Sequence, residues 1–545
     1  MKLGTMTVLL ACATMFCLVW VGSAQADPPY WHRVLVDADG EDCGHWCSLA
    51  FDPNGNPAVA YFDGNGDLVV ARLDPDGPGS PDGVWNKTVI ASAAQWTDDM
   101  GGMTLAFQPN GYPAVAYAYG EFVLSGAAWA YAWEDAGGWH AVDIPVGDVT
   151  PGFLPDVNNR VRLCFDFGGR PWVVLDVALP PSVVALAATP AGGPSGAWQV
   201  GTIIMHCSPS SPATRSDLAI DPNDGWPHVS FQNPVPGDDP PEEWVGLGQH
   251  DPAAPLELYG EWSWGAVCSP DSIGGPQYGP LPTSLAFDSL GRPGIATFLA
   301  HGGTHIYYLS SAAGPWTIRQ VVEVPGLWDD FSREAILAYR SDGNPGISYR
   351  GKLDATHIWP MMYTWLDPND PNDVNGVWQF REVDGRPVRG QANKGLYHSH
   401  AIDPNGLPAV AYYDSTFDCL RYAVTADEPD TYSLDVTIEG GTGSWGTVEK
   451  DPDLERYPEG TIVTLTAVPN PDRSFVQWKI LDPRYPGDAN HEITDANNPI
   501  QLVMLYDMEV KAVFGCSGSD ALFLAMVGAA VLTLGVVKLR RRWLA

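Results

Sequence analysis

The sequence predicts an all-β protein whose main part is a closed ring of seven four-stranded sheets. Two features that each occur seven times lead to this fold class, together with their phase along the chain. One is a Gly-x-Pro step before a short apolar segment, and the other is a single Trp about thirty residues further on. The glycines are Gly55, Gly111, Gly169, Gly225, Gly291, Gly343 and Gly406, and the tryptophans are Trp31, Trp85, Trp139, Trp198, Trp262, Trp316 and Trp378.

The first repeat illustrates the four strands. Leu49 and Phe51 alternate with small or polar residues, as in a strand with one buried face. The Asp-Pro-Asn-Gly sequence that ends at Gly55 predicts a tight turn, because Pro fixes one backbone angle and Gly accepts a positive φ. Apolar segments at 58–61, 68–71 and 85–90 supply three further strands. One repeat therefore predicts one antiparallel four-stranded sheet.

The recurring Trp is expected on the outermost strand, packed between neighbouring sheets. A sheet of this size cannot bury both of its faces alone, so consecutive sheets must stack. A buried Trp removes about 150–250 Å² from water, which gives at most roughly 4–6 kcal/mol of hydrophobic stabilisation. We therefore expect the seven tryptophans to supply much of the cohesion between sheets.

The phase of the two repeats indicates how the ring closes. The first Trp segment, residues 30–36, precedes every Gly-x-Pro step, and the last repeat, near Pro408, has no Trp segment after it. The N-terminal segment should therefore supply the outermost strand of the last sheet, and closure leaves no exposed edge. We interpret residues 27–430 as a seven-bladed β-propeller. An open β-solenoid or several sandwiches is the alternative, and it leaves the phase shift unexplained.

A second all-β unit is predicted over residues 431–515. Strand alternation and Gly/Pro turns continue, but the Gly-x-Pro repeat stops. A Tyr457–Ala467 run, an F-x-x-W at Phe475–Trp478 and a terminal Ala512–Phe514 segment resemble the bacterial modules related to internalin B-repeats. The resemblance implies a spacer or adhesion unit of a cell-surface protein, and it brings no catalytic residues.

Charge and the N-terminal segment predict an exported protein. The net charge is −36, with 65 acidic and 29 basic residues, which argues against nucleic acid and anionic membrane surfaces as partners of the main body. Residues 1–26 fit a signal peptide, with an apolar run at 8–21 and an Ala24–Ala26 cleavage site. A lipoprotein box at Cys12 is a weaker alternative, because it comes before a full apolar region. We expect the propeller to be monomeric.

Residues 516–545 are predicted to be a C-terminal tail with one transmembrane helix. The segment from Ala521 to Val537 is uncharged and barely long enough to span. Four basic residues follow and place the end of the chain in the cytoplasm and the propeller outside; they are Lys538, Arg540, Arg541 and Arg542. The layout resembles bacterial C-terminal sorting tails, which implies processing near Cys516 and transfer to the cell surface. A plain membrane anchor is the alternative.

The cysteines fit an oxidising compartment. Cys43 and Cys47 precede the first sheet, and Cys419 lies in a predicted loop of the last one, so ring closure makes them neighbours. We expect a disulfide from Cys419 to one of the other two, with Cys207 and Cys268 as further disulfide candidates. A metal site at Cys43, His45 and Cys47 is the rival interpretation, but no second ligand pair has metal-site spacing.

The ligand site is expected in the irregular loops on the face opposite the Gly-x-Pro turns, because long loops on one side of a scaffold often carry function. Aromatic platforms with carboxylates suit sugars, and Asp pairs suit Ca²⁺; no cofactor is identified. For each residue the alternative is an ordinary solvated loop. The ligand-binding candidates are Trp96, Asp98, Asp99, Trp244, His301, His305, Trp328, Asp329, Arg333, Arg350, His357 and His398.

The predicted function is that of a cell-surface-tethered, non-enzymatic binding or adhesion protein whose ligand is a glycan or a protein. The sequence contains no G-x-S-x-G, H-E-x-x-H or P-loop motif. Turns such as Asp135–Trp139 resemble the Asp-box of sialidase-like propellers but lack its full spacing. That resemblance implies the alternative, an exported glycoside hydrolase or lyase. A sialidase would need a Tyr nucleophile with a carboxylate and three converging arginines, for which Arg333, Arg350 and Arg389 are the candidates.

Overall fold

The computed structural model describes residues 30–516 apart from a set of internal segments, and for part of some strands and all of 183–188 it describes the backbone alone. The excluded segments are 39–42, 78–82, 93–101, 120–127, 146–160, 178–182, 189–197, 206–215, 235–242, 251–261, 269–281, 301–303, 312–314, 325–333, 352–358, 370–374, 386–393, 416–417, 427, 440–444, 482–491 and 505. The predicted signal peptide and the apolar segment 521–537 lie outside the described residues. Among those described, no helix is long and apolar enough to cross a membrane.

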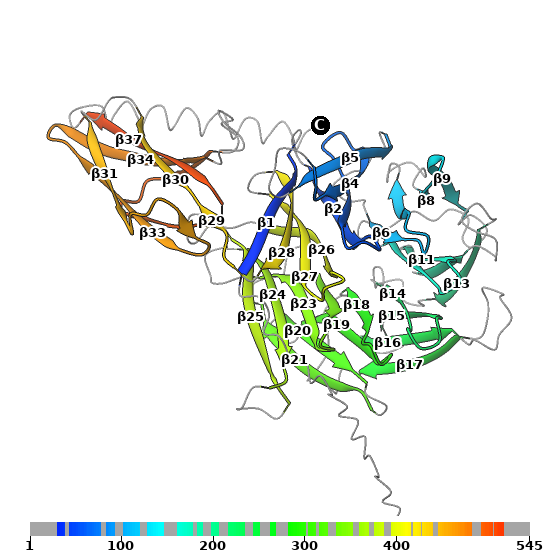
Figure 1. Cartoon of the computed structure of the whole chain (residues 1–545). Helices are drawn as coiled ribbons and strands as arrows, with labels where there is room; N and C mark the ends of the chain where they lie inside the picture. Colours follow the sequence, from blue (N-terminus) through cyan, green and yellow to red (C-terminus); the bar gives the residue numbers. More distant parts are fainter. Residues whose placement is uncertain are drawn as a thin grey trace, which may run out of the picture.

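Seven antiparallel four-stranded sheets make up the larger part of the molecule (Figure 1). Sheet 1 is β2 (His45–Phe51), β3 (Pro57–Phe62), β4 (Leu68–Asp74) and β5 (Val84–Ala91). Sheet 2 is β6 (Met103–Phe107), β7 (Pro113–Tyr119), β8 (Ala128–Asp135) and β9 (Gly138–Ile144). Sheet 3 is β10 (Val161–Phe165), β11 (Pro171–Val177), β12 (Val183–Ala188) and β13 (Gln199–Met205).

The next three sheets repeat this meander. Sheet 4 is β14 (Asp217–Ile220), β15 (Pro227–Pro234), β16 (Glu243–His250) and β17 (Trp262–Cys268). Sheet 5 is β18 (Thr283–Phe287), β19 (Pro293–Ala300), β20 (Thr304–Ser310) and β21 (Thr317–Glu323). Sheet 6 is β22 (Ala335–Tyr339), β23 (Pro345–Arg350), β24 (Met361–Asp367) and β25 (Val377–Asp384).

Sheet 7 closes the ring with strands from both ends of the repeat region. It contains β26 (Lys394–Ile402), β27 (Pro408–Asp414), β28 (Cys419–Ala426) and the N-terminal β1 (Tyr30–Asp37). β1 pairs antiparallel with β28 from Tyr30 opposite Ala426 onward. The first strands of the seven sheets contact one another in a cycle, which starts at β2 and returns from β26 to β2. The predicted closure by the N-terminal strand is therefore confirmed, and the arrangement is propeller-like.

The repeated Trp packs between sheets, as predicted. Each of the seven belongs to, or lies against, a separate buried cluster that joins two neighbouring sheets. Trp31, only 1% exposed, meets the ring of Tyr363 on sheet 6 edge to face at 5.6 Å between centroids. Trp85 meets Tyr422 on sheet 7 in the same way. The indoles therefore act as wedges between sheets.

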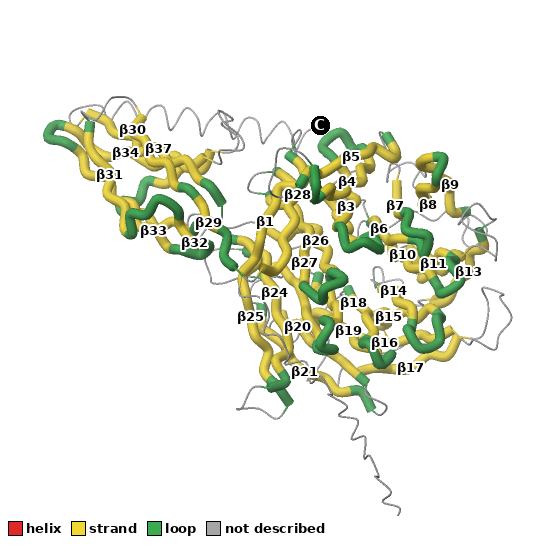
Figure 2. Tube along the Cα trace, in the orientation of Figure 1, coloured by secondary structure: helices red, strands yellow, loops and turns green. Residues whose placement is uncertain are grey.

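The Gly-x-Pro turns form a second ring on one face, which we call the turn face (Figure 2). In the first turn the Asp52 carboxylate accepts hydrogen bonds from the amides of Asn54 and Asn56, each at 2.8 Å. Gly55 has φ +90°, a conformation that disfavours other residues. A Cβ on Gly55 would touch Pro404 of the sheet 7 turn at 3.5 Å, so neighbouring turns nearly abut.

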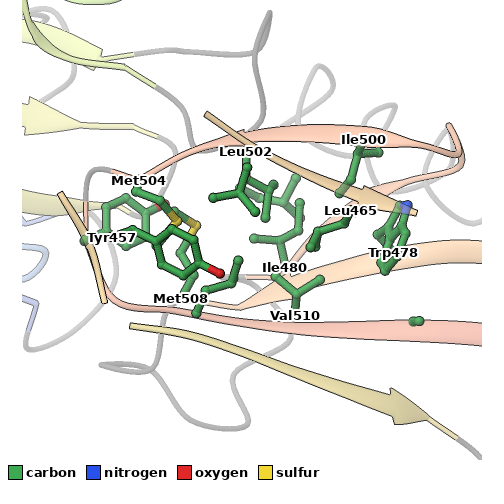
Figure 3. Close-up of a cluster of buried hydrophobic side chains, with 14 of the residues drawn as sticks. Tyr457, Leu465, Trp478, Ile480, Ile500, Leu502, Met504, Met508 and Val510 are labelled. Carbon is green, nitrogen blue, oxygen red and sulfur yellow. The ribbon is translucent and has the colours of Figure 1, made fainter. Parts of the chain in front are cut away.

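The second unit is also all-β. Its strands are β29 (Thr431–Tyr432), β30 (Leu434–Glu439), β31 (Gly446–Asp451), β32 (Tyr457–Pro458), β33 (Ile462–Pro469), β34 (Arg473–Leu481), β35 (Glu492–Asp495), β36 (Ile500–Val503) and β37 (Met508–Cys516). A four-stranded and a three-stranded sheet enclose a core that includes Trp478, Leu465 and Met508 (Figure 3). The Trp478 indole donates to the carbonyl of Asn497 at 2.9 Å, so its polar atom is satisfied.

This second unit packs against the sheet that closes the ring. Leu35 of β1 lies against its core, and Cys419 of β28 belongs to that core. Arg33 of β1 forms a buried ion pair with Glu459 at 2.8 Å. The Arg421 guanidinium of β28 lies over the ring of Tyr506 at 5.4 Å. The unit is therefore attached to the closing seam by buried contacts, unlike a spacer joined only through its linker.

The disulfide prediction at this seam is wrong in the structure. Cys43, Cys47, Cys268 and Cys419 are all thiols, and Cys419 begins strand β28 where a loop was expected. The chain does bring the segments together, because the Cys43 amide donates to the Asp418 carbonyl at 3.3 Å. Burial, with a contribution from Asp37, raises the pKa of the Cys43 thiol to about 12. Main-chain pairing and packing close the seam in place of a covalent bond; Cys207 lies outside the described residues.

Candidate functional site

The first strands of all seven sheets surround a cavity of about 220 Å³ at the centre of the ring. Each sheet contributes two to four lining residues. They lie at or near the start of its first strand, which is the end nearer the irregular loops. The end of this cavity that faces the loops, around Trp46 of sheet 1 and Tyr397 of sheet 7, is called the channel mouth below. It lies on the face where the sequence placed the ligand site.

Deeper in the channel, polar side chains join neighbouring sheets. The hydroxyl of Ser48 accepts a hydrogen bond from the Leu105 amide at 2.9 Å, one sheet along. Ser399 and Ser284, which occupy the same repeat position, accept from Leu49 and Leu337, each at 3.0 Å. These groups satisfy backbone donors that strand pairing leaves open. Their role is to close the ring.

Two charged residues occupy the same belt. Asp217 of sheet 4 accepts a hydrogen bond from the Leu285 amide at 2.7 Å, and it pairs with the Arg162 guanidinium of sheet 3 at 2.8 Å. Both therefore bridge sheets 3, 4 and 5 in the same manner as the serines. A ligand in the cavity would meet charges that already have partners.

The channel mouth has a different character, because two aromatic residues there have strained backbones. Trp46 has φ +55° and Tyr397 has φ +51°, and such values are unusual for bulky residues. Each lies at an irregularity in the pairing of its strand, between His45 and Ser48 on β2 and between Leu396 and Ser399 on β26. Bulges of this kind redirect side chains.

The bulges bring the two aromatic rings together. The Trp46 and Tyr397 centroids are 4.5 Å apart, with the ring planes tilted by 38°. The Cys47 thiol donates to the carbonyl of Tyr397 at 2.8 Å, which ties the two bulges across the seam. Both rings are half-buried. Strain that is held by such contacts is characteristic of functional sites.

Ionisable groups lie beside the aromatic pair. Glu334, just before β22, lines the cavity, and its negative charge adds to burial in raising the pKa of the Cys47 thiol. His398 is 3% exposed and lies 3.3 Å from the carbonyl of Ser348. His400 is buried with Nδ1 at 3.1 Å from the Ile336 carbonyl, and burial lowers its pKa to about 4. His400 is therefore neutral at pH 7, and Glu334 supplies the negative charge.

Three of the predicted ligand residues have described side chains, and they do not gather at one place. His398 lines the cavity, but it lies within strand β26 where a loop was expected. Arg350 ends β23, is 3% exposed and stacks on Trp359 at 4.9 Å, so it is a packing residue. His305 lies on β20 beside Gln320, and the cavity does not include it.

The side chains of the remaining candidates lie outside the described residues, so their predictions stay untested. They are Trp96, Asp98, Asp99, Trp244, His301, Trp328, Asp329, Arg333 and His357. Within the described part of the chain, no group of three or more His, Cys, Asp or Glu side chains is placed to hold a metal ion. The acidic loop residues considered for Ca²⁺ lie outside that part.

Sequence reasoning missed Trp46, Tyr397 and Glu334 as members of one site. These residues immediately precede the apolar core of a repeat, at the position that Gly102 occupies in sheet 2. Only two of the seven repeats carry an aromatic residue at this position, Trp46 and Tyr397, and the other five carry Gly, Arg, Arg, Pro and Glu. The positive φ values leave no trace in the sequence, because neither residue is a glycine.

The fold belongs to the propeller-like class of closed β-sheet rings. Similar solved structures include an ulvan lyase of polysaccharide lyase family PL25, at 14% identity over 73% of this chain and 96% of that chain, with a TM-score of 0.47. The Aleuria aurantia lectin in complex with Fucα1-6GlcNAc matches at 13% identity over 65% and 99%, with a TM-score of 0.38. The NanB sialidase of Streptococcus pneumoniae matches at 10% identity over 72% and 70%, with a TM-score of 0.39. No protein-family model matches the sequence, and the search of curated proteins gave no match.

Proposed function

We propose that this protein binds carbohydrate at the channel mouth, on the platform that Trp46 and Tyr397 form. The observation that carries the proposal is their pairing at 4.5 Å on two strained bulges. Trp46 also packs against the core between sheets 1 and 2, but Gly102 at the same position of sheet 2 indicates that the repeat itself does not need an aromatic residue there. Strain that the surrounding structure maintains at a cavity supports a role in ligand binding.

The chemistry of the mouth favours a sugar. The face of an aromatic ring suits the apolar face of a pyranose, and a few polar groups beside it suit the hydroxyls. Glu334 supplies acceptor oxygens, and it lines the same cavity as the two aromatic rings. A volume of about 220 Å³ leaves room for one sugar ring at the mouth, so we propose that a chain end or single residue inserts there.

The wider proposal is an exported adhesion protein. We propose that the seven sheets are the blades of a monomeric β-propeller, that residues 1–26 direct export, and that residues 516–545 tether or sort the protein to the cell surface. The second unit, a bacterial repeat module by its sequence pattern, would hold the propeller at a fixed angle. Its buried ion pair at the seam supports this rigid arrangement.

An enzymatic role, as a glycoside hydrolase or lyase, is the competing function. A sialidase-type site needs arginines that are available to a substrate carboxylate. The described arginines near the centre have other partners, since Arg162 pairs with Asp217 and Arg350 stacks on Trp359. Arg333 and Arg389 lie outside the described residues. These contacts favour binding over catalysis.

A glycan array tests the proposal directly. We expect the wild-type protein to bind a restricted set of glycans and Trp46→Gly to lose that binding, while thermal unfolding shows that the variant stays folded. Trp133→Leu is the matched control, because Trp133 is also half-buried but stacks on His140 in sheet 2, away from the mouth. Absence of any glycan signal would overturn the proposal. Release of new reducing ends or unsaturated products from a bound glycan would establish the enzymatic alternative.

A further inference from the structure

The turn face carries a larger cavity than the channel, between sheets 5 and 6. Its volume is about 540 Å³, within the range of small-molecule binding sites. It is lined by the turn of sheet 5, by the turn of sheet 6 at Gly343–Pro345, and by strands β20 and β21. We call it the turn-face groove. None of the predicted ligand residues lies in it.

The groove opens where the ring of turns is interrupted. A Cβ built on the glycine of a Gly-x-Pro turn would meet an atom of the preceding turn in six of the seven repeats, all of which are described. Gly111 meets Pro53 and Gly169 meets Pro109, each at 3.5 Å. Gly343 is the exception, because nothing lies within 4 Å of the corresponding position. The break and the groove therefore coincide.

The walls of the groove also depart from the repeat. Tyr339 occupies a position where the other six sheets carry Phe or Ile, and its hydroxyl lies 2.7 Å from that of Tyr308. Gly294 makes room for this hydroxyl, because a Cβ there would overlap it. Burial raises the pKa of Tyr339, so the pair remains protonated and able to hydrogen-bond at physiological pH.

Two guanidinium groups give the groove a local positive excess in a chain of net charge −36. Arg292 pairs with Asp288 through Nε at 2.5 Å, and its side chain is 46% exposed. Arg319 donates from both terminal nitrogens to the carbonyls of Asn375 and Gly376, at 2.6 and 2.8 Å. No carboxylate pairs with Arg319 among the described residues. The groove thus holds two cations and one anion.

From this geometry we propose that the turn-face groove is a second binding site, and that it takes an acidic saccharide containing a uronic acid. The terminal nitrogens of Arg292 match a carboxylate, which guanidinium groups bind in a bidentate manner. Ser310, Thr317 and the tyrosine hydroxyls provide hydrogen bonds for sugar hydroxyls. This site is independent of the channel mouth and lies on the opposite face, so one molecule would contact two saccharide chains.

Isothermal titration calorimetry tests this site with four trisaccharides. Three are acidic, built of galacturonate, glucuronate or mannuronate, and the fourth is neutral maltotriose. We expect at least one acidic trisaccharide to bind, more weakly at high salt, and maltotriose not to bind at the groove. Arg292→Gln should weaken the acidic ligand at least about tenfold, because it loses the charge-assisted contact. Thr317→Trp, which fills the groove without altering an ion pair, should have the same effect.

Arg170→Gln is the matched control, because Arg170 and Asp166 repeat the same turn pair on sheet 3, where the ring of turns is closed. The Arg170→Gln variant should bind the acidic trisaccharide as the wild type does. The Trp46→Gly variant should also bind it normally, which would show that the groove binds independently of the channel mouth. Failure of all three acidic probes to bind would overturn the proposal. Equal binding of maltotriose, or equal losses in Arg292→Gln and Arg170→Gln, would do so as well.

Discussion

The carboxylate of Glu459 in the second unit lies 2.8 Å from the guanidinium of Arg33 in the strand that closes the ring, and both side chains are buried. Glu459 also accepts the amide of Trp31 at 3.2 Å, and Arg33 donates to the Val383 carbonyl of sheet 6 at 2.6 Å. One pair of residues thus joins the second unit, the N-terminal strand and the preceding sheet. The seam and the second unit should therefore unfold together.

Glu459→Gln tests this coupling. The substitution leaves the Arg33 charge buried without its partner, and breaking a buried pair in this way costs about 3–5 kcal/mol. We expect a matching loss in the free energy of unfolding, measured by chemical denaturation, and faster proteolysis near residue 430. Glu439→Gln is the control, because Glu439 pairs with Lys479 at the surface, where a pair contributes about 0.2–1 kcal/mol at most. Equal effects of the two variants would contradict the coupling.

His400 predicts a specific dependence of stability on pH. Its pKa is lowered from 6.5 to about 4 in the folded protein, so the unfolded chain binds the extra proton first as the pH falls. Stability should therefore drop between pH 6.5 and 4 and level off below that. The loss attributable to His400 is roughly 3 kcal/mol.

The His400→Leu variant isolates this contribution, because Leu occupies the same position in the other six sheets. The difference in unfolding free energy between the wild type and this variant should vary with pH between 6.5 and 4 and be flat above pH 7. Parallel stability curves for the two proteins across the acid range would show that His400 is not held neutral.

The two tyrosines Tyr412 and Tyr131 should respond differently to loss of their hydroxyls. Tyr412 donates to the fully buried Asp384 carboxylate at 2.6 Å, so Tyr412→Phe removes a donor from a buried charge and should cost about 1–3 kcal/mol. The buried Tyr131 hydroxyl has no partner among the described residues, so Tyr131→Phe should be neutral or slightly stabilising. Thermal unfolding of both variants checks the contrast, and similar shifts in the two would contradict it.

Removal of the N-terminal strand should prevent stable folding. A chain that begins after residue 38 lacks β1, which leaves the edge of β28 exposed and removes the Trp31 wedge. Exposed edges pair with other chains, so we expect aggregation on size-exclusion chromatography. Adding a peptide of residues 30–38 should restore some monomer. A stable monomer without β1 would contradict the role assigned to this strand.

The architecture of the ring follows from the sequence because its signals are local and repeated. Turns such as Asp52–Gly55 require particular residue types, and each repeated Trp buries a large side chain between two sheets. Counting these turns and tryptophans therefore predicts both the sheets and the closure of the ring by β1. The bulges at Trp46 and Tyr397 could not be predicted in this way. They depend on contacts between sheets 1 and 7. One of these contacts, the hydrogen bond from Cys47 to Tyr397, joins residues that are 350 positions apart in the sequence.

The same limit explains the corrected expectations. His398 is expected in a loop, whereas the structure places it within strand β26, at a bulge that interrupts the pairing with β27. The Cys419 disulfide was inferred from proximity, and proximity is what the structure shows, without the bond. The attachment of the second unit rests on Arg33 and Glu459, single residues without periodicity, so no sequence pattern pointed to it.

The central claim is that the aromatic pair at the channel mouth binds a sugar. Isothermal titration calorimetry with the glycan selected on the array tests this claim most directly. The glycan is titrated into the wild type and into the Trp46→Gly and Trp133→Leu variants. The predicted result is a single-site isotherm for the wild type and Trp133→Leu, with at least about tenfold weaker binding, or about 1.4 kcal/mol, for Trp46→Gly. Unchanged affinity in a folded Trp46→Gly variant would contradict the account.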